Sequence, residues 1–411
     1  MTGTLRLILS LAAGSVACTG ATASPDVYLT WQRDPTTTMT VCWQDAAPGP
    51  GAVEWRPAGA DQWSKAAASA PRLLPGTDRI AAHAELTGLQ PDTDYEFRCG
   101  EEDAIRRFRT LPATLDRPLT FVEGGDPQDG PAMEQMLRLA ASRDPAFVVI
   151  GGDLTFDDGL SEHAGRVERF FRALGRDLVA SDGRQIPVVV CVGNHDVNRD
   201  RQWIIDNEAL PRDAESRRAV APYFVASWPF PGERGYGVLD AGDYLSLVVL
   251  DTNHLNAVDG PQLDWLRATL AARKHIPHLF PVYHVPAYPG VRDLRDEMST
   301  LIRGAWTPLF EQAGVRLAFE HHEHAFKATH PLRGGKQSAD GTVYLGGGAM
   351  GVELRDPRDP AREPHLAKTA KSHHLHEVVL ESQRRTVRTI DLDGRDIHRL
   401  QQTVRDSPDD P

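Results

Sequence analysis

"VVVCVGNHD", residues 188–196, joins a run of apolar, mostly β-branched residues to three polar side chains. Such a run is typical of a strand that is buried on both faces of a sheet. Burying a polar or charged side chain costs free energy unless the group is paired or binds a metal. Asn194, His195 and Asp196 therefore predict that something bound at the end of this strand compensates for their burial.

Other buried strand candidates also end in polar side chains. "LTFVEGGD" ends in Asp126, "AFVVIGGD" in Asp153 and "HLFPVYH" in His284, while "VRLAFEHHEH" leads to His322 and His324. Strand alternation predicts that His322 and His324 point to the same side.

Helical patterns separate these strands, over residues 132–143, 163–178 and 261–274. Alternating strands and helices favour an α/β domain with parallel strands, in which ligands gather at the carboxyl ends of the strands. We expect this domain to span residues 119–402, to include closing strands near 374–382 and 386–394, and to end in a frayed polar tail over 403–411. The Pro- and charge-rich segment 356–372 is interpreted as a loop.

The polar residues at the strand ends have the chemistry of metal ligands, because carboxylate, amide and imidazole donors suit Fe, Mn or Zn. The candidate ligands are Asp126, Asp153, Asn194, His284, His322 and His324. This set is too large for one tetrahedral zinc site. It fits two metals roughly 3.5–4 Å apart that share a bridging carboxylate.

Composition excludes some classes of protein. The chain has 411 residues, 41 % of them hydrophobic and 25 % charged, with a formal net charge of −12. It is long enough for more than one domain. An acidic balance does not suggest a nucleic-acid-binding surface. No stretch is long and apolar enough to predict a membrane span.

The first 23 residues have the pattern of a secretory signal. Arg6 precedes the apolar run 7–17, and "ATA" at 21–23 forms a cleavage pattern before Ser24. We therefore expect export. A lipid anchor on Cys18 is an alternative, but Ser15 stands where a lipoprotein signal has an aliphatic residue, so soluble export is favoured.

Residues 25–111 show short alternating strands separated by Gly, Pro and Asp, which predicts an all-β sandwich. In "LTGLQPDTDYEFRCG", 86–100, the Leu, Pro, Thr and Tyr spacing is that of a tyrosine corner, and the region resembles a fibronectin type III domain. Residues 112–118 are interpreted as a linker. Alternation turns Cys42 outward and Cys99 inward, which argues against a disulfide, and Cys191 is expected to be an inert core thiol.

The order GD, GD, GNHD, H, HxH along the chain resembles the signature of the calcineurin-like metallophosphoesterases. Within them, the chain resembles the purple acid phosphatases through its N-terminal domain, "YHVPAY" (283–288), "HHEHAFKATHP" (321–331) and "GTVYLGGGAMG" (341–351). The resemblance implies a β-sandwich core flanked by helices and a phosphoester substrate.

The resemblance also implies a role for each residue of the site. Asp126 and His324 would bind the first metal, Asp153 would bridge both metals, and Asn194, His284 and His322 would bind the second. His195 would contact the phosphate and protonate the leaving oxygen, and Asp196 would orient His195.

Two departures concern the metals. Phe156 stands where purple acid phosphatases have a metal-binding tyrosine, so we expect a colourless divalent pair (Mn, Zn or ferrous iron) and an activity optimum nearer neutrality. Gln128 stands where other members of the superfamily have a histidine, and its amide oxygen is a further candidate ligand.

A third departure concerns phosphate binding, because the histidines that follow the His284 motif in plant enzymes are absent. Arg292 and Arg295 are candidates to replace them, although solvated loop arginines are an equal alternative. His254 is a candidate to line the cleft, with loop structure favoured.

Two other clusters carry less weight. Residues 373–376 hold three histidines, which alternation splits between the faces of a strand, so a third metal site is not favoured. "FDDG", 156–159, is interpreted as a turn with solvated carboxylates.

The predicted function is that of an exported dinuclear-metal phosphomonoesterase. A metal-activated hydroxide would attack phosphorus, and His195 would act as the leaving-group acid. A phosphodiesterase, nucleotidase or phospholipid-cleaving enzyme remains an alternative. A non-catalytic surface-binding protein is a more distant one. The oligomeric state stays open.

Overall fold

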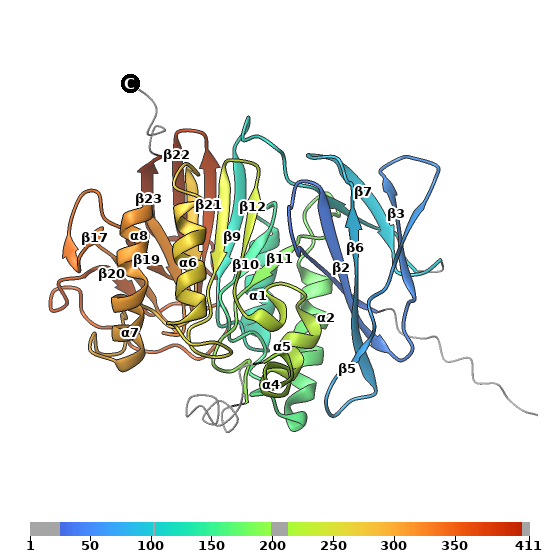
Figure 1. The fold of residues 1–411 in the computed structure, drawn as a ribbon, viewed down its shortest axis with the longest axis horizontal. Helices are drawn as coiled ribbons and strands as arrows, with labels where there is room; N and C mark the ends of the chain where they lie inside the picture. The colour runs from blue at the N-terminus through green and yellow to red at the C-terminus, as the bar shows by residue number, and fades with distance from the viewer. Residues whose placement is uncertain (1–24, 102, 199–212, 405–411) are drawn as a thin grey trace, which may run out of the picture.

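The fold is described here from a computed structural model, which covers residues 25–101, 103–198 and 213–404. The predicted signal, Cys18 and most of the tail lie outside these residues. Figure 1 shows a β-sandwich at the right and a larger α/β domain at the left. No helix among the described residues is long and apolar enough to cross a membrane.

The N-terminal sandwich consists of two four-stranded sheets. Their orders are β1 (Asp26–Thr30), β2 (Thr38–Ala46), β6 (Arg79–Thr87), β5 (Arg72–Leu73), and β4 (Ser64–Ala67), β3 (Ala52–Pro57), β7 (Asp94–Arg98), β8 (Arg106–Arg109). The backbone N–H of Gln90 donates to the hydroxyl oxygen of Tyr95 at 2.7 Å, which ties the corner to the strand start. The all-β sandwich is thus confirmed.

The sheet β1–β2–β6 packs with its outer face on the α/β domain, against α2 (Ala164–Asp177) and α5 (Pro222–Ser227). The ring of Tyr28 lies 4.7 Å from that of Phe171, and its hydroxyl donates to the carbonyl oxygen of Ser227 at 2.5 Å. Cys42 faces away from its own sandwich, as alternation predicts, but this interface buries it completely. Among the described residues all three cysteines are free, and Cys42 and Cys99 lie in different apolar clusters.

The α/β domain is a second, larger sandwich with helices on both outer faces. One sheet has the order β11 (Val188–Val190), β10 (Val148–Ile150), β9 (Leu119–Gly124), β21 (His374–Glu381), β22 (Arg384–Asp391), β23 (Asp396–Thr403). The other has the order β12 (Gly237–Ala241), β13 (Leu245–Val249), β14 (His278–Val282), β15 (Leu317–Glu320), β19 (Val343–Gly346), β16 (Phe326–Thr329), β20 (Leu366–Ala370). A small hairpin joins β17 (Leu332–Arg333) to β18 (Lys336–Gln337).

Apolar side chains hold these layers together. Between the sheets, the ring of Phe121 lies 5.9 Å from Phe280 and 6.2 Å from Phe319. The helices α1 (Pro131–Ala141), α2 (Ala164–Asp177), α4 (Ala214–Val220) and α5 (Pro222–Ser227) contribute to the core on one outer face, and α6 (Pro261–Ala271), α7 (Glu297–Ala305) and α8 (Thr307–Ala313) to that on the other. Strands buried on both faces explain why their sequences read as continuous apolar runs.

Two features of the topology bear on the predictions. The strands β9, β10 and β11 pair in parallel, and so do β13, β14 and β15, which brings their carboxyl ends to one edge.

The segment 356–372 is not a loop throughout, because residues 366–370 form the edge strand β20, antiparallel to β16. Lys368 on this strand is exposed, and charged side chains are common on sheet edges.

Candidate metal centre

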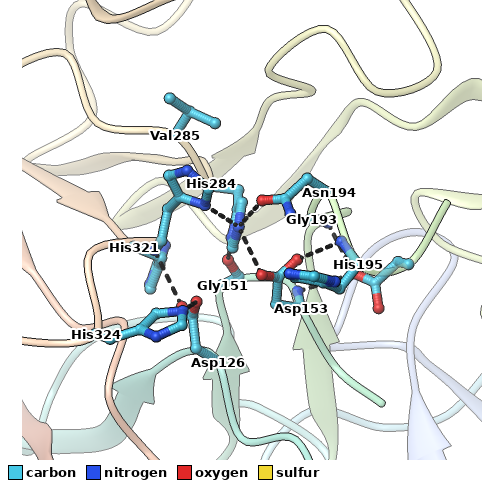
Figure 2. A network of polar contacts seen from close by, with 12 residues as sticks. Asp126, Gly151, Asp153, Gly193, Asn194, His195, His284, Val285, His321 and His324 are labelled. Carbon is cyan, nitrogen blue, oxygen red and sulfur yellow. Dashed lines mark hydrogen bonds and ion pairs between the residues drawn. The ribbon is translucent and has the colours of Figure 1, made fainter. Parts of the chain in front are cut away.

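The polar side chains predicted to cluster do meet where the carboxyl ends of the two sheets come together. Asp126, Asp153 and Asn194 follow β9, β10 and β11 in one sheet. His284 follows β14, and the pair His322 and His324 follows β15, in the other. Figure 2 shows Asp126 beside His324, and Asp153 beneath His284 and Asn194.

The backbone at these strand ends is turned into the left-handed region. The φ angle is 53° at Asp126 and Asp153, 72° at His322 and 55° at His324. Residues other than glycine rarely adopt such angles, and those that do cluster at functional sites. His322 and His324 lie in a loop, so the interpretation by strand alternation was wrong, and left-handed turns set their directions instead.

The centre contains two groups of candidate ligands that share one carboxylate. The first group is Asp126, Asp153 and His324, and the second is Asp153, His284 and His322. Within each group, the ligand atoms lie within 4.8 Å of one another. Asp153 belongs to both groups, which is the arrangement that a bridging carboxylate requires.

Two carboxylate oxygens in these groups are buried and accept no hydrogen bond from the described residues, Oδ1 of Asp126 and Oδ2 of Asp153. Each faces an imidazole nitrogen, at 3.4 Å to Nε2 of His324 and at 3.3 Å to Nε2 of His284. A buried carboxylate oxygen without a donor is costly, and a cation removes that cost. The residues present therefore fit metal ions.

Backbone carbonyl oxygens orient two of the imidazole rings through their Nδ1 atoms. Nδ1 of His284 lies 2.8 Å from the carbonyl oxygen of Gly151, and Nδ1 of His324 lies 3.0 Å from that of Glu353. These bonds leave Nε2 of each ring facing the carboxylates, as in known sites where a second hydrogen bond fixes a metal-ligating histidine. Nε2 of His284 also lies 3.2 Å from Oδ1 of Asn194 and 3.2 Å from Nδ1 of His322.

The groups of the centre shift one another's pKa values. Burial by itself would raise the pKa of Asp153, but His284 and then His195 and His322 lower it below its usual range. Burial would lower the pKa of His284, but Asp153 and Asp126 raise it to about 9. Burial and then the charge of His284 lower the pKa of His322. Without metal, a proton on His284 thus balances part of the carboxylate charge.

Asp196 was predicted to orient His195, and the structure contradicts this. The Asp196 carboxylate instead accepts the backbone N–H groups of Asp153 at 2.9 Å, Leu154 at 2.8 Å and Gly193 at 2.7 Å. Burial and then the charge of Asp153 raise its pKa. Asp196 therefore ties the end of β10 to the end of β11 and positions the backbone of the shared ligand.

Asp158 takes the place that was predicted for Asp196. Its Oδ1 lies 2.7 Å from Nδ1 of His195, and the backbone N–H of His195 donates to Oδ1 of Asp153 at 2.7 Å. The turn predicted within 156–159 is present at residues 158–159, but its carboxylates are paired rather than solvated, so that part of the interpretation was wrong. Asp157 is also buried, because the Thr155 hydroxyl and the Gly159 N–H donate to it.

Phe156 lies against the centre but offers no ligand atom. Its ring stacks on that of His195 at 4.2 Å with an interplanar angle of 19°, and its centroid is 6.4 Å from that of His324. The stacking restricts the plane of the His195 ring. Among the described residues, Gln128 belongs to no group of candidate metal ligands and forms no hydrogen bond. Its backbone φ of 57° is left-handed. Its role as a metal ligand stays a prediction.

Of the predicted phosphate-binding residues, His254 and Arg292 lie close to the metal-centre histidines, and Arg295 lies in an exposed ion pair. His254 is buried, and its ring centroid lies 5.8 Å from that of His284. Burial and then His284 lower its pKa to about 3. Arg292 reaches the carbonyl oxygen of His322 at 3.4 Å. The Arg295 side chain is 90 % exposed and pairs with Asp293, which corresponds to the alternative of a solvated loop arginine.

The histidines of 373–376 form no metal group among the described residues. His374 and His376 share one face of β21, and the carbonyl oxygen of Gly346 lies within hydrogen-bond distance of both rings. The prediction missed one cation near the centre, Arg355, whose Nη1 lies 3.3 Å from the His322 carbonyl oxygen. It lies more than 30 positions along the chain from its contact, so local sequence carried no signal for it.

Two family descriptions match this chain. The purple acid phosphatase N-terminal domain matches residues 24–110, and the calcineurin-like phosphoesterase domain matches residues 126–326. The chain thus carries a calcineurin-like phosphoesterase domain behind a domain of the purple acid phosphatase N-terminal type. More narrowly, it is similar to purple acid phosphatases.

Known relatives agree with this assignment. Purple acid phosphatases 18 and 21 of Arabidopsis thaliana are 25 % and 26 % identical, over 71 % and 68 % of this chain. These matches span 63 % and 62 % of the relatives' own lengths. The solved structure of a purple acid phosphatase from yellow lupin has the same fold, with a TM-score of 0.73, 14 % identity, and coverage of 92 % of this chain and 74 % of that one.

The role of Asp196 leads to a prediction about stability. Asp196→Ala would leave three buried N–H groups without an acceptor, and each costs about 1–3 kcal/mol. We expect the free energy of unfolding to fall by at least about 3 kcal/mol in urea denaturation. Asp116→Ala, which removes an exposed carboxylate, is the control and should change stability by less than about 0.5 kcal/mol. Equal stability of the two variants would refute this role for Asp196.

Proposed function

We propose that this protein is an exported phosphomonoesterase that works with two divalent metal ions, Mn, Fe or Zn. The observation that carries the proposal is the position of Asp153 in both ligand groups, with one buried oxygen that accepts no hydrogen bond from any residue that the structure describes. A structural role alone gives no reason to bury two carboxylates and three imidazoles together. Export rests on the signal pattern of residues 1–23.

The proposed ligands follow the two groups. Asp126 and His324 would hold one ion, His284, His322 and Asn194 the other, and Asp153 both. Gln128 is a further candidate. Two bound divalent ions supply Lewis acidity, which makes water nucleophilic near neutral pH and offsets phosphoryl charge.

His195 is the proposed acid for the leaving group. The Asp158 carboxylate accepts from Nδ1, which leaves Nε2 as the ring atom that would donate a proton to the departing oxygen. The Phe156 ring on one face and the backbone bond to Asp153 fix the position of His195. The side chain of His195 remains 20 % exposed, which allows contact with a substrate.

The decisive test compares Asp153→Ala with Asp129→Ala. Asp129 is a matched control because it pairs with Arg169 at 2.6 Å and belongs to neither ligand group. The proteins are loaded with Mn, Fe or Zn, and metal content is measured together with turnover of aryl and alkyl monoesters and of diesters. We expect about two metals per chain and monoester turnover in the wild type and the control, and loss of both in Asp153→Ala. Full activity of Asp153→Ala would overturn the assignment.

A second prediction separates the acid from the ligands. His195→Ala should keep its metals but lose about 10²–10⁴-fold in kcat, and Asp158→Asn should lose less in the same direction. The loss should be greatest for alkyl esters, because an aryl leaving group needs little protonation. Losses of the same size for aryl and alkyl esters would contradict the role as an acid.

A third prediction concerns Phe156. With no phenolate near the first ion, the iron-loaded wild type should show no strong visible absorption band, and its pH optimum should be near neutral. Phe156→Tyr places a hydroxyl on a ring that already lies beside His324, and it should introduce such a band under ferric conditions. A strong band in the wild type would mean that another tyrosine binds the metal.

A further inference from the structure

The loop that follows β19 is fastened to the first ligand group by backbone hydrogen bonds. The N–H groups of Gly351 and Val352 each donate to the carbonyl oxygen of Asp126 at 3.2 Å. The carbonyl of Glu353 lies 3.0 Å from Nδ1 of His324, and the N–H of Arg355 donates to the carbonyl oxygen of His324 at 3.0 Å. The start of the Arg355 side chain is therefore held beside the metal centre.

The guanidinium of Arg355 differs from that of its neighbour Arg292. Both donate from Nη1 to the His322 carbonyl oxygen, at 3.3 Å and 3.4 Å. Arg292 also pairs with Oε1 of Glu323 at 2.8 Å, which neutralises it. Among the described residues no carboxylate forms an ion pair with Arg355, and partial burial followed by the charge of Arg292 lowers its pKa.

A half-buried guanidinium with spare N–H donors beside a metal centre suits an anion, and arginine matches the geometry of phosphate oxygens. A phosphomonoester has a third terminal oxygen and a second negative charge, whereas a diester has neither. We propose that Arg355 binds a terminal oxygen of the substrate's phosphoryl group and thereby favours monoesters over diesters. This inference rests on the proposed function and adds a specificity residue to it.

The test uses Arg355→Gln and Arg355→Lys in the full metal-loaded protein, with Arg295→Gln as the control because the Arg295 side chain is 90 % exposed. Calorimetry measures the Kd for inorganic phosphate, and steady-state kinetics compares p-nitrophenyl phosphate with bis(p-nitrophenyl) phosphate. In Arg355→Gln we expect phosphate to bind at least about 10-fold more weakly, and kcat/KM to fall about 10–100-fold for the monoester and less than about 3-fold for the diester. Arg355→Lys should lie between, because its charge remains without the fork of donors.

The outcomes separate this inference from the proposed function. Unchanged phosphate affinity, or an equal fall in kcat/KM for both esters, would overturn the role of Arg355. Reduced metal content in Arg355→Gln would show a structural role and would also overturn it. A wild type that binds two metals and phosphate but hydrolyses neither ester would refute the proposed function, while the phosphate titration would still decide whether Arg355 binds the anion.

Discussion

The buried carboxylates of Asp126 and Asp153 are the constraint on which the rest of this structure depends. Each is a fully buried side chain just beyond the end of a strand, where an uncompensated negative charge would cost several kcal/mol or more. The imidazoles that face them, the left-handed turns that aim them and the carbonyls that orient those imidazoles all serve this arrangement. The fold thus brings together buried carboxylates and imidazoles that would hold cations.

Much of the centre could be predicted because its ligands follow strands in the sequence. A buried strand that ends in Asp or His can be recognised from the sequence alone. Parallel pairing then brings such strand ends to one edge of the sheet. Neither step requires knowledge of side-chain directions. The β-sandwich was predictable for a similar reason, since alternation and the tyrosine corner are local patterns.

What could not be predicted depends on turns and on distant contacts. The residue that pairs with His195 is Asp158 and not Asp196. The backbone at Asp158 has a left-handed φ of 53°, and the sequence pattern did not predict that angle. Asp157 is buried through bonds within its own turn. Arg355 reaches His322 only because its loop is fastened to Asp126 and His324. In each case a single backbone angle or a long-range hydrogen bond decides the outcome.

The interface between the two domains has a consequence for handling the protein. Phe171 and Trp228 of the α/β domain pack on Tyr28 of the sandwich, at 4.7 Å and 5.0 Å between ring centroids. Cutting the chain between β8 and β9 would expose these aromatic rings to water, and contiguous apolar patches promote aggregation. The sandwich thus shields these rings from water, and the two domains are best expressed and purified as one piece.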